Sequence, residues 1–215
     1  MNLVNELQVS AEQDDVLTVL RKTKRLASKL GRKDISDWLQ AETEGYDGEV
    51  PDYRMVKTIL AVRTNGYVPA GFGLVMDGIK EINGFDTPDI PVKESVSDIV
   101  TTLEGLARKN HGLYYPIPQT PAMDRLRSRL CSDPRFETQL SLLFRLNERQ
   151  VQSIPEKVKD KVLDWALALE EAGVTGDGMT FSAREKEIAH NVTFNIMNST
   201  IEQLNNQGNN QRGSR

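Results

Sequence analysis

Apolar residues recur every three or four positions over several long stretches of the chain, which is the spacing of one face of an α-helix. The first stretch opens at Ser10–Gln13, where a Ser hydroxyl and a Gln amide form a capping box and predict a helix start. Its last apolar position precedes Gly31, a residue suited to end a helix. A second helix is predicted from Asp34, as N-cap, to Gly45.

Four further helices are predicted downstream. One follows Pro91 and presents an apolar stripe at helical spacing, and the next begins at Thr120–Pro121 and ends near Cys131. Capping boxes at Ser153–Glu156 and Ser182–Glu185 predict the starts of the last two. The first of these two is expected to bury Trp165 as a core anchor.

Other stretches depart from the helical pattern. Residues 53–63 are rich in β-branched residues, and five glycines lie between Asn65 and Gly84. We therefore expect a small β-hairpin or β-loop insert at about residues 50–90. The segment 111–119 holds two prolines and two tyrosines and is predicted to be a loop, whereas the short apolar run Leu140–Leu146 fits either a strand or a buried helix.

The pattern changes again after His190. Apolar residues alternate with polar ones from Val192 to Ile196, as in a strand, and seven of the nine residues from Gln203 to Gln211 are Asn or Gln. The predicted fold class is mainly α, a helical domain with a small β-hairpin or β-loop insert and a strand-like C-terminal segment. The predicted domains are residues 1–190, which include the insert, and residues 191–215, a strand-like segment with an Asn/Gln-rich tail.

Composition narrows the class of protein. The net charge of -4 gives no general attraction to nucleic acid or to an anionic membrane, so neither is expected as a partner. The single cysteine, Cys131, suits a reducing compartment, and the first residues lack the basic and apolar regions of a signal peptide. With no run of about 18 apolar residues, we expect a cytoplasmic protein.

Candidate catalytic groups are few. Glu187 and His190 have a spacing that can place two metal ligands on one helix face, but di-iron bundles need two such motifs and further glutamates, so we expect no metal and no cofactor. An acidic run offers a better pair for acid–base chemistry, although such residues at a helix end are ordinarily solvated surface. This acidic run consists of Glu42, Glu44, Asp47, Glu49 and Asp52.

Arginines between Arg125 and Arg135, and the basic residues from Lys22 to Lys33, form two local basic patches. Both have acidic neighbours and neither belongs to a nucleic-acid-binding motif, so they are interpreted as solvated helix faces.

The C-terminal segment is a candidate assembly element. It has high strand propensity, no charge and no proline from Val192 to Ile201, and Asn and Gln residues follow that can form ladders between chains. The alternative is a strand that completes the protein's own sheet. The predicted interaction residues are Val192, Phe194, Ile196 and Ile201.

Four sequence phrases, taken in order, resemble a known family. They are Asp37–Tyr46 (DWLQAETEGY), Pro51–Arg54 (PDYR), Val162–Gly173 (VLDWALALEEAG) and Gly176–Ser182 (GDGMTFS). Together they are similar to the AbiTii domain, and the similarity spans most of the chain. The resemblance implies a role in bacterial abortive infection or phage conflict, and it supplies no catalytic residues.

The leading hypothesis is therefore an antiphage defence module of the abortive-infection type that is not an enzyme. It acts through protein–protein interaction or self-assembly, with a second copy of itself or another defence-system protein as partner. The alternative is a toxic effector enzyme, such as a nuclease, that uses the acidic residues near 42–52. A plain scaffold or subunit of a larger complex is a third hypothesis.

Overall fold

The computed structural model describes residues 2–64, 68–70, 73–75, 78–109, 112–131, 133–176 and 180–193. Over these residues the chain is mainly α-helical with a small antiparallel sheet, which confirms the predicted fold class at this level. Two compact units are present, and each is described by itself. The helical unit comprises Met1–Arg54, Val92–Leu103 and Gln152–Arg215, and the sheet unit comprises Met55–Pro91 and Glu104–Val151.

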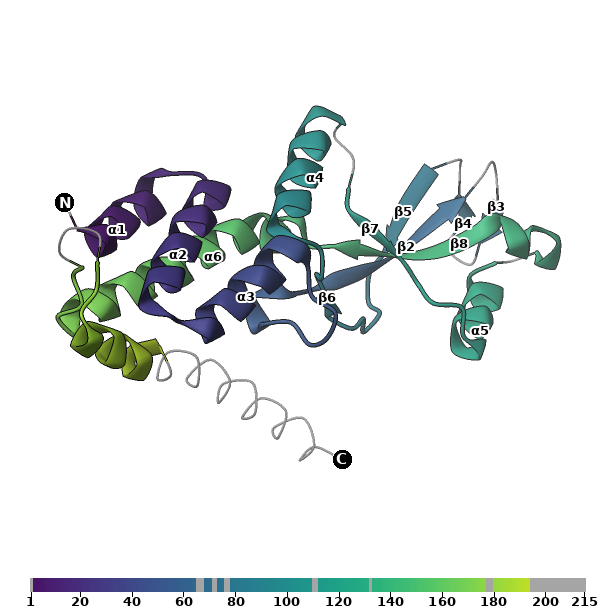
Figure 1. Ribbon diagram of the computed structural model, residues 1–215. Helices are drawn as coiled ribbons and strands as arrows, with labels where there is room; N and C mark the ends of the chain where they lie inside the picture. The colour runs from purple at the N-terminus through teal and green to yellow at the C-terminus, as the bar shows by residue number, and fades with distance from the viewer. Residues whose placement is uncertain are drawn as a thin grey trace. The chain divides into compact units, whose positions relative to one another are not determined.

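The helical unit begins with three consecutive helices: α1 (Leu3–Gln13), α2 (Val16–Leu30) and α3 (Lys33–Glu44). α1 packs on α2 and α2 packs on α3, as Figure 1 shows. The helix start predicted at Ser10 is wrong, because Ser10 lies inside α1. The chain breaks instead at Asp14 and Asp15, where the Asp15 carboxylate accepts hydrogen bonds from the first backbone N–H groups of α2.

Two predicted helix ends are confirmed. Gly31 follows α2 with a φ of 68°, and Gly45 follows α3 with a φ of 97°. Glycine is favoured at both positions because other residues rarely adopt a positive φ. The predicted N-cap of the second helix is two residues late, since α3 starts at Lys33 and Asp34 lies in its first turn.

The long helix α6 (Glu148–Glu171) belongs to the helical unit from residue 152 onward and contributes buried side chains to its core. The start predicted at Ser153 is wrong, because Asn147 caps the helix six residues earlier and accepts a hydrogen bond from the Gln150 backbone N–H. Trp165 is buried, as predicted. The predicted helix after Pro91 is α4 (Val96–Lys109).

Residues 183–193 form the last described helix. The predicted capping box is confirmed, since the Ser182 hydroxyl accepts the Glu185 backbone N–H and the Glu185 carboxylate accepts the Ser182 backbone N–H. The strand expected to begin near Val192 is wrong for residues 191–193, which continue this helix. Residues 194–215 lie outside the described residues.

One apolar core holds the helical unit together. Its members come from every helix of the unit, including the part of α4 up to Leu103, and burial of this apolar surface is the main force that stabilises the unit. The fully buried side chains at its centre include Val4, Leu7, Val19, Leu26, Ala27, Val96, Val158, Val162, Trp165, Ala166 and Leu169.

The sheet unit is built on a four-stranded antiparallel sheet in the order β5-β2-β8-β7. The central strands β2 (Thr58–Thr64) and β8 (Leu140–Leu146) pair along their whole length, and β5 (Gly78–Ile82) and β7 (Tyr114–Pro116) lie at the edges. Leu140–Leu146 is thus a strand, and the loop predicted for residues 111–119 contains β7. A second apolar core lies on one face of the sheet, where α5 (Pro121–Leu130) contacts β8.

The remaining elements of the sheet unit are short. β1 (Met55–Val56) pairs with β6 (Ile90–Pro91), β3 (Val68–Ala70) pairs with β4 (Gly73–Val75), and the 3-10 helix η2 (Pro134–Gln139) precedes β8. The predicted N-cap of α5 is confirmed, since the Thr120 hydroxyl accepts the Met123 backbone N–H. Among the described residues, none of the helices combines the length and apolar character that a membrane crossing requires.

Candidate functional site

The five carboxylates of the acidic run differ in solvent exposure. Glu42 is completely buried, whereas the other four side chains are exposed: Glu44, Asp47, Glu49 and Asp52. The acidic run is therefore not a pocket of paired acids. Its one interior member is the centre of a polar cluster in the helical unit, which we call the Glu42 cluster.

Glu42 lies in the last turn of α3, and its partner Arg54 is the last residue of the 3-10 helix η1 (Asp52–Arg54). The Arg54 Nη2 atom lies 2.5 Å from Glu42 Oε2, and Nε donates a second hydrogen bond to Oε1 at 3.3 Å. Both side chains have zero solvent exposure. This is a two-point ion pair without access to water, the geometry that a planar guanidinium favours.

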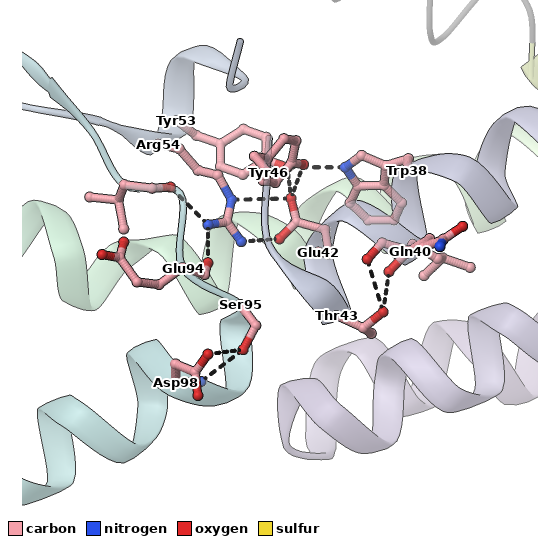
Figure 2. Close-up of polar contacts among 12 residues, drawn as sticks. Trp38, Gln40, Glu42, Thr43, Tyr46, Tyr53, Arg54, Glu94, Ser95 and Asp98 are labelled. Atoms are coloured by element: carbon pink, nitrogen blue, oxygen red, sulfur yellow. Dashed lines mark hydrogen bonds and ion pairs between the residues drawn. The ribbon is translucent and has the colours of Figure 1, made fainter. Parts of the chain in front are cut away.

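Two tyrosines complete the coordination of the carboxylate. The hydroxyls of Tyr46 and Tyr53 each donate to Glu42 Oε1 at 2.5 Å, as Figure 2 shows. Trp38, one turn before Glu42 on α3, donates its indole N–H to the Tyr53 hydroxyl at 3.1 Å. Each polar group of these side chains therefore has a partner, as buried polar groups require.

Arg54 also holds the chain segment that enters α4. Its Nη1 atom donates to the carbonyl oxygens of Val92 and Glu94, at 3.0 and 2.8 Å. The Val92 backbone N–H donates in turn to the Arg54 carbonyl at 2.9 Å. The guanidinium lies over the Tyr46 ring, 4.8 Å from its centroid, within the range of a cation–π contact.

Gly45 lets α3 approach this same segment closely. The Tyr46 backbone N–H donates to the Lys93 carbonyl at 2.8 Å. A Cβ atom on Gly45 would lie 2.9 Å from that carbonyl oxygen, closer than real Cβ contacts come. The Glu42 cluster thus needs glycine at position 45 for both its φ and its lack of a side chain.

The electrostatics of the cluster keep its protons in place. Burial, together with the neighbouring Glu42 charge, raises the pKa of both tyrosine hydroxyls well above the usual range. Burial acts to lower the pKa of Arg54, but its hydrogen bonds to Glu42 and the Glu42 charge outweigh burial and raise it. Arg54 therefore stays cationic and both tyrosines stay neutral over the accessible pH range.

The chemistry of this arrangement is structural. A general acid or base must exchange a proton with a substrate or water within hydrogen-bond reach. Both oxygens of Glu42 are occupied by Arg54 and the two tyrosines, and no solvent reaches them. Glu42 fixes α3 to η1, and Arg54 extends this network to the backbone at residues 92 and 94, just before α4.

The burial of Glu42 could have been predicted from the spacing of residues along α3. Ile35, Leu39 and Glu42 are spaced four and three residues apart and occupy one face of α3, and all three are buried. A carboxylate in line with an apolar stripe indicates a buried, paired charge. The partners Tyr53 and Arg54 carry no such periodic signal.

The other predicted site residues are placed as follows. His190 and Glu187 are exposed on the helix 183–193. No group of three or more His, Cys, Asp or Glu side chains that could hold a metal occurs within the described part of the chain.

Of the predicted interaction residues, only Val192 is described. It is half-buried and packs against the core of the helical unit. Its neighbour Thr193 is buried, accepts the Trp165 indole N–H at 3.0 Å and donates to the Ala189 carbonyl at 2.7 Å. The remaining three, Phe194, Ile196 and Ile201, lie outside the described residues, so a role for them in interaction stays a prediction.

Comparison with known proteins agrees with the resemblance carried by the sequence phrases. The AbiTii family model matches residues 2–194, a range that includes all the described residues of both units. No curated protein and no solved structure gives a significant match. Two of the phrases that carry the resemblance, residues 37–46 and 51–54, supply the five side chains of the Glu42 cluster. The chain belongs to the AbiTii family, and this membership implies a role in antiphage defence by abortive infection.

Proposed function

We propose that this protein is a noncatalytic module of abortive-infection defence that acts through protein–protein interaction or self-assembly. The observation that carries the proposal is the sequestration of Glu42. The alternative, a toxic enzyme such as a nuclease, relied on the acidic residues near 42–52, and acid–base chemistry needs at least one of them in contact with substrate. The one member drawn into the fold is instead saturated by Arg54, Tyr46 and Tyr53.

The sheet unit offers apolar surface for a partner. Ile59 and Ile79 lie on the same face of the sheet, because Ile79 pairs with Arg63 and residues 59 and 63 share one side of β2. Both isoleucines are about 40% exposed. Three more large apolar side chains of this unit are also exposed: Met55, Phe85 and Tyr115. Ile59 and Ile79 are the exposed apolar side chains of this sheet face that we propose a partner contacts.

The C-terminal segment remains part of the proposal. Phe194, Ile196 and Ile201 belong to an uncharged sequence of high strand propensity that can pair between chains. The informative truncation ends at Thr193. An earlier end, at His190, would remove the hydrogen-bond partner of Trp165 and disturb the helical core.

The test combines phage plating on cells that express each variant with light-scattering mass of the purified protein. We expect the double substitution Ile59→Ser and Ile79→Ser, or the truncation after Thr193, to reduce assembly or protection while the circular dichroism spectrum is kept. The matched control is Val9→Ser with Leu167→Ser, which removes two exposed apolar side chains from the helical unit.

A second set of variants tests the enzyme alternative. Alanine at Glu44, Asp47, Glu49 and Asp52 together removes the four exposed carboxylates and leaves the Glu42 cluster intact. We expect protection to be unchanged. Loss of protection or of toxicity in this quadruple variant, with the fold preserved, would overturn the noncatalytic proposal in favour of an enzyme.

A further inference from the structure

The helical unit contains a hollow between α2 and α3, lined by side chains from both helices. Its volume is about 590 Å³, within the range of about 300–1,000 Å³ that small-molecule sites occupy. α2 contributes Leu17, Leu20, Arg21 and Lys24; α3 contributes Ser36, Leu39, Gln40, Thr43 and Glu44; and the first turn of α4 contributes Ser97.

The spacing of these residues shows why a hollow forms here. On α2 they are related by three, four and seven positions, and on α3 by three, four, seven and eight, so each set forms one continuous helix face. The two helices are antiparallel neighbours joined by the tight turn at Gly31 and Arg32. The faces therefore meet with the first half of α2 opposite the second half of α3.

The floor of the hollow is apolar. Leu20 and Leu39 are each 2% exposed, and Leu17 is half-buried. The α3 wall is polar but largely self-satisfied, since the Thr43 hydroxyl donates to the carbonyls of Leu39 and Gln40 (Figure 2). An apolar body placed on the floor would thus leave these hydrogen bonds of the Thr43 hydroxyl in place.

The α2 wall carries the unmatched charge. Arg21 and Lys24 are exposed, and neither makes a hydrogen bond or an ion pair with another described residue. The one acidic residue of the hollow, Glu44, lies on the opposite helix and accepts the Gln40 amide at 2.9 Å. Two free cations next to an apolar floor form a site with complementary chemistry for an amphiphilic anion.

We propose that this hollow binds a small organic anion, whose apolar body lies on Leu17, Leu20 and Leu39 and whose anionic group contacts Arg21 and Lys24. The site is separate from the Glu42 cluster and does not depend on the proposed partner surfaces. It gives the protein a place to respond to a soluble ligand.

The probe is 1-anilinonaphthalene-8-sulfonate, an aromatic anion whose fluorescence rises in apolar sites. N-phenyl-1-naphthylamine, which has the same aromatic body without the sulfonate, separates the apolar from the ionic contribution. We expect Arg21→Gln with Lys24→Gln to weaken sulfonate binding about tenfold and to change binding of the neutral probe by less than about twofold. The matched control, Lys33→Gln with Lys157→Gln, removes two exposed cations elsewhere and should change neither probe.

A filling variant tests the floor. Thr43→Phe places an aromatic ring in the hollow and should weaken binding of both probes, and Gln40→Trp is the second such variant should the first lower the urea midpoint. Binding of the sulfonate that is equal in the wild type and the Arg21/Lys24 variant would overturn the proposal. So would binding that survives both filling variants, because the probe would then occupy another surface, and so would the absence of saturable binding.

Discussion

The substitution Arg54→Met measures how strongly the Glu42 cluster stabilises the helical unit. Methionine keeps an unbranched apolar stem but removes the guanidinium. Glu42 then retains two tyrosine donors and loses both hydrogen bonds to Arg54 and its counter-charge, with no water to replace them. Removing one partner of a buried ion pair costs about 3–5 kcal/mol, which is a large part of the roughly 5–15 kcal/mol that stabilises a typical protein.

A double-mutant cycle separates the ion pair from the loss of packing. Glu42→Gln keeps an acceptor for the hydroxyls of Tyr46 and Tyr53 but leaves Arg54 buried without a counter-charge. In the double variant Glu42→Gln with Arg54→Met neither charge remains. We therefore expect the double variant to lose less stability than the two single losses added together. The difference should be at least about 2 kcal/mol in free energy of unfolding.

Tryptophan fluorescence during urea unfolding is the assay. The chain has two tryptophans, Trp38 and Trp165, and both lie in the helical unit, so their signal follows that unit. The control is Lys22→Met, which breaks an ion pair to Asp14 of 2.9 Å whose side chains are about one-third exposed. It should lower the urea midpoint much less than Arg54→Met does, because exposed ion pairs are screened by solvent. A cost below about 1 kcal/mol for Arg54→Met, or additive effects in the cycle, would refute the argument.

Three further predictions concern single positions. Hydrogen bonds from backbone N–H groups lower the pKa of Glu185 from 4.5 to about 2, so the stability that this carboxylate contributes is present above pH 4.5 and lost as the pH falls toward 2. The free energies of unfolding of wild type and Glu185→Ala, measured in urea, should differ by about 1 kcal/mol at pH 7 and converge near pH 2. A difference that does not change with pH would contradict this. Gly45→Ala should destabilise by more than Gly31→Ala, whose cost is about 1 kcal/mol, because an added Cβ meets a backbone carbonyl only at position 45; equal thermal shifts would count against this contact. Thr193→Val leaves the buried indole N–H of Trp165 without its acceptor and should cost about 1–3 kcal/mol in thermal or urea unfolding, whereas an unchanged midpoint would show that water replaces the hydroxyl.

Local signals predicted a good part of the helical fold. Gly31, Gly45, the Thr120 cap and the box at Ser182–Glu185 all act as expected, because each involves groups within one helical turn of one another. The same motif failed at Ser10, since α1 starts at Leu3 and buries an apolar face before Ser10 is reached. A capping motif predicts an end only where no packed turn precedes it.

Interactions between distant segments could not be predicted from local patterns. The run Leu140–Leu146 fits a strand or a helix until β2 is placed beside it, and β7 forms from a segment with loop-like composition because β8 offers it a free edge. In the C-terminal region, Val192 alternates with its neighbours as in a strand. Residues 191–193 are helical instead, because a helix places Ala189, Val192 and Thr193, at spacings of three and four, against the core.

The sequence by itself determined the fold class, most of the helix ends and, through four phrases, the family. These follow from backbone conformation and from groups near one another along the chain. Only the tertiary structure decided that Glu42 is a buried structural anion, because its neutralisation depends on Arg54, twelve positions away, and on the backbone at Val92 and Glu94. A glutamate is the same residue in the sequence whether its carboxylate is solvated or buried. The two cases differ in desolvation, which arises only when the folded chain surrounds the carboxylate.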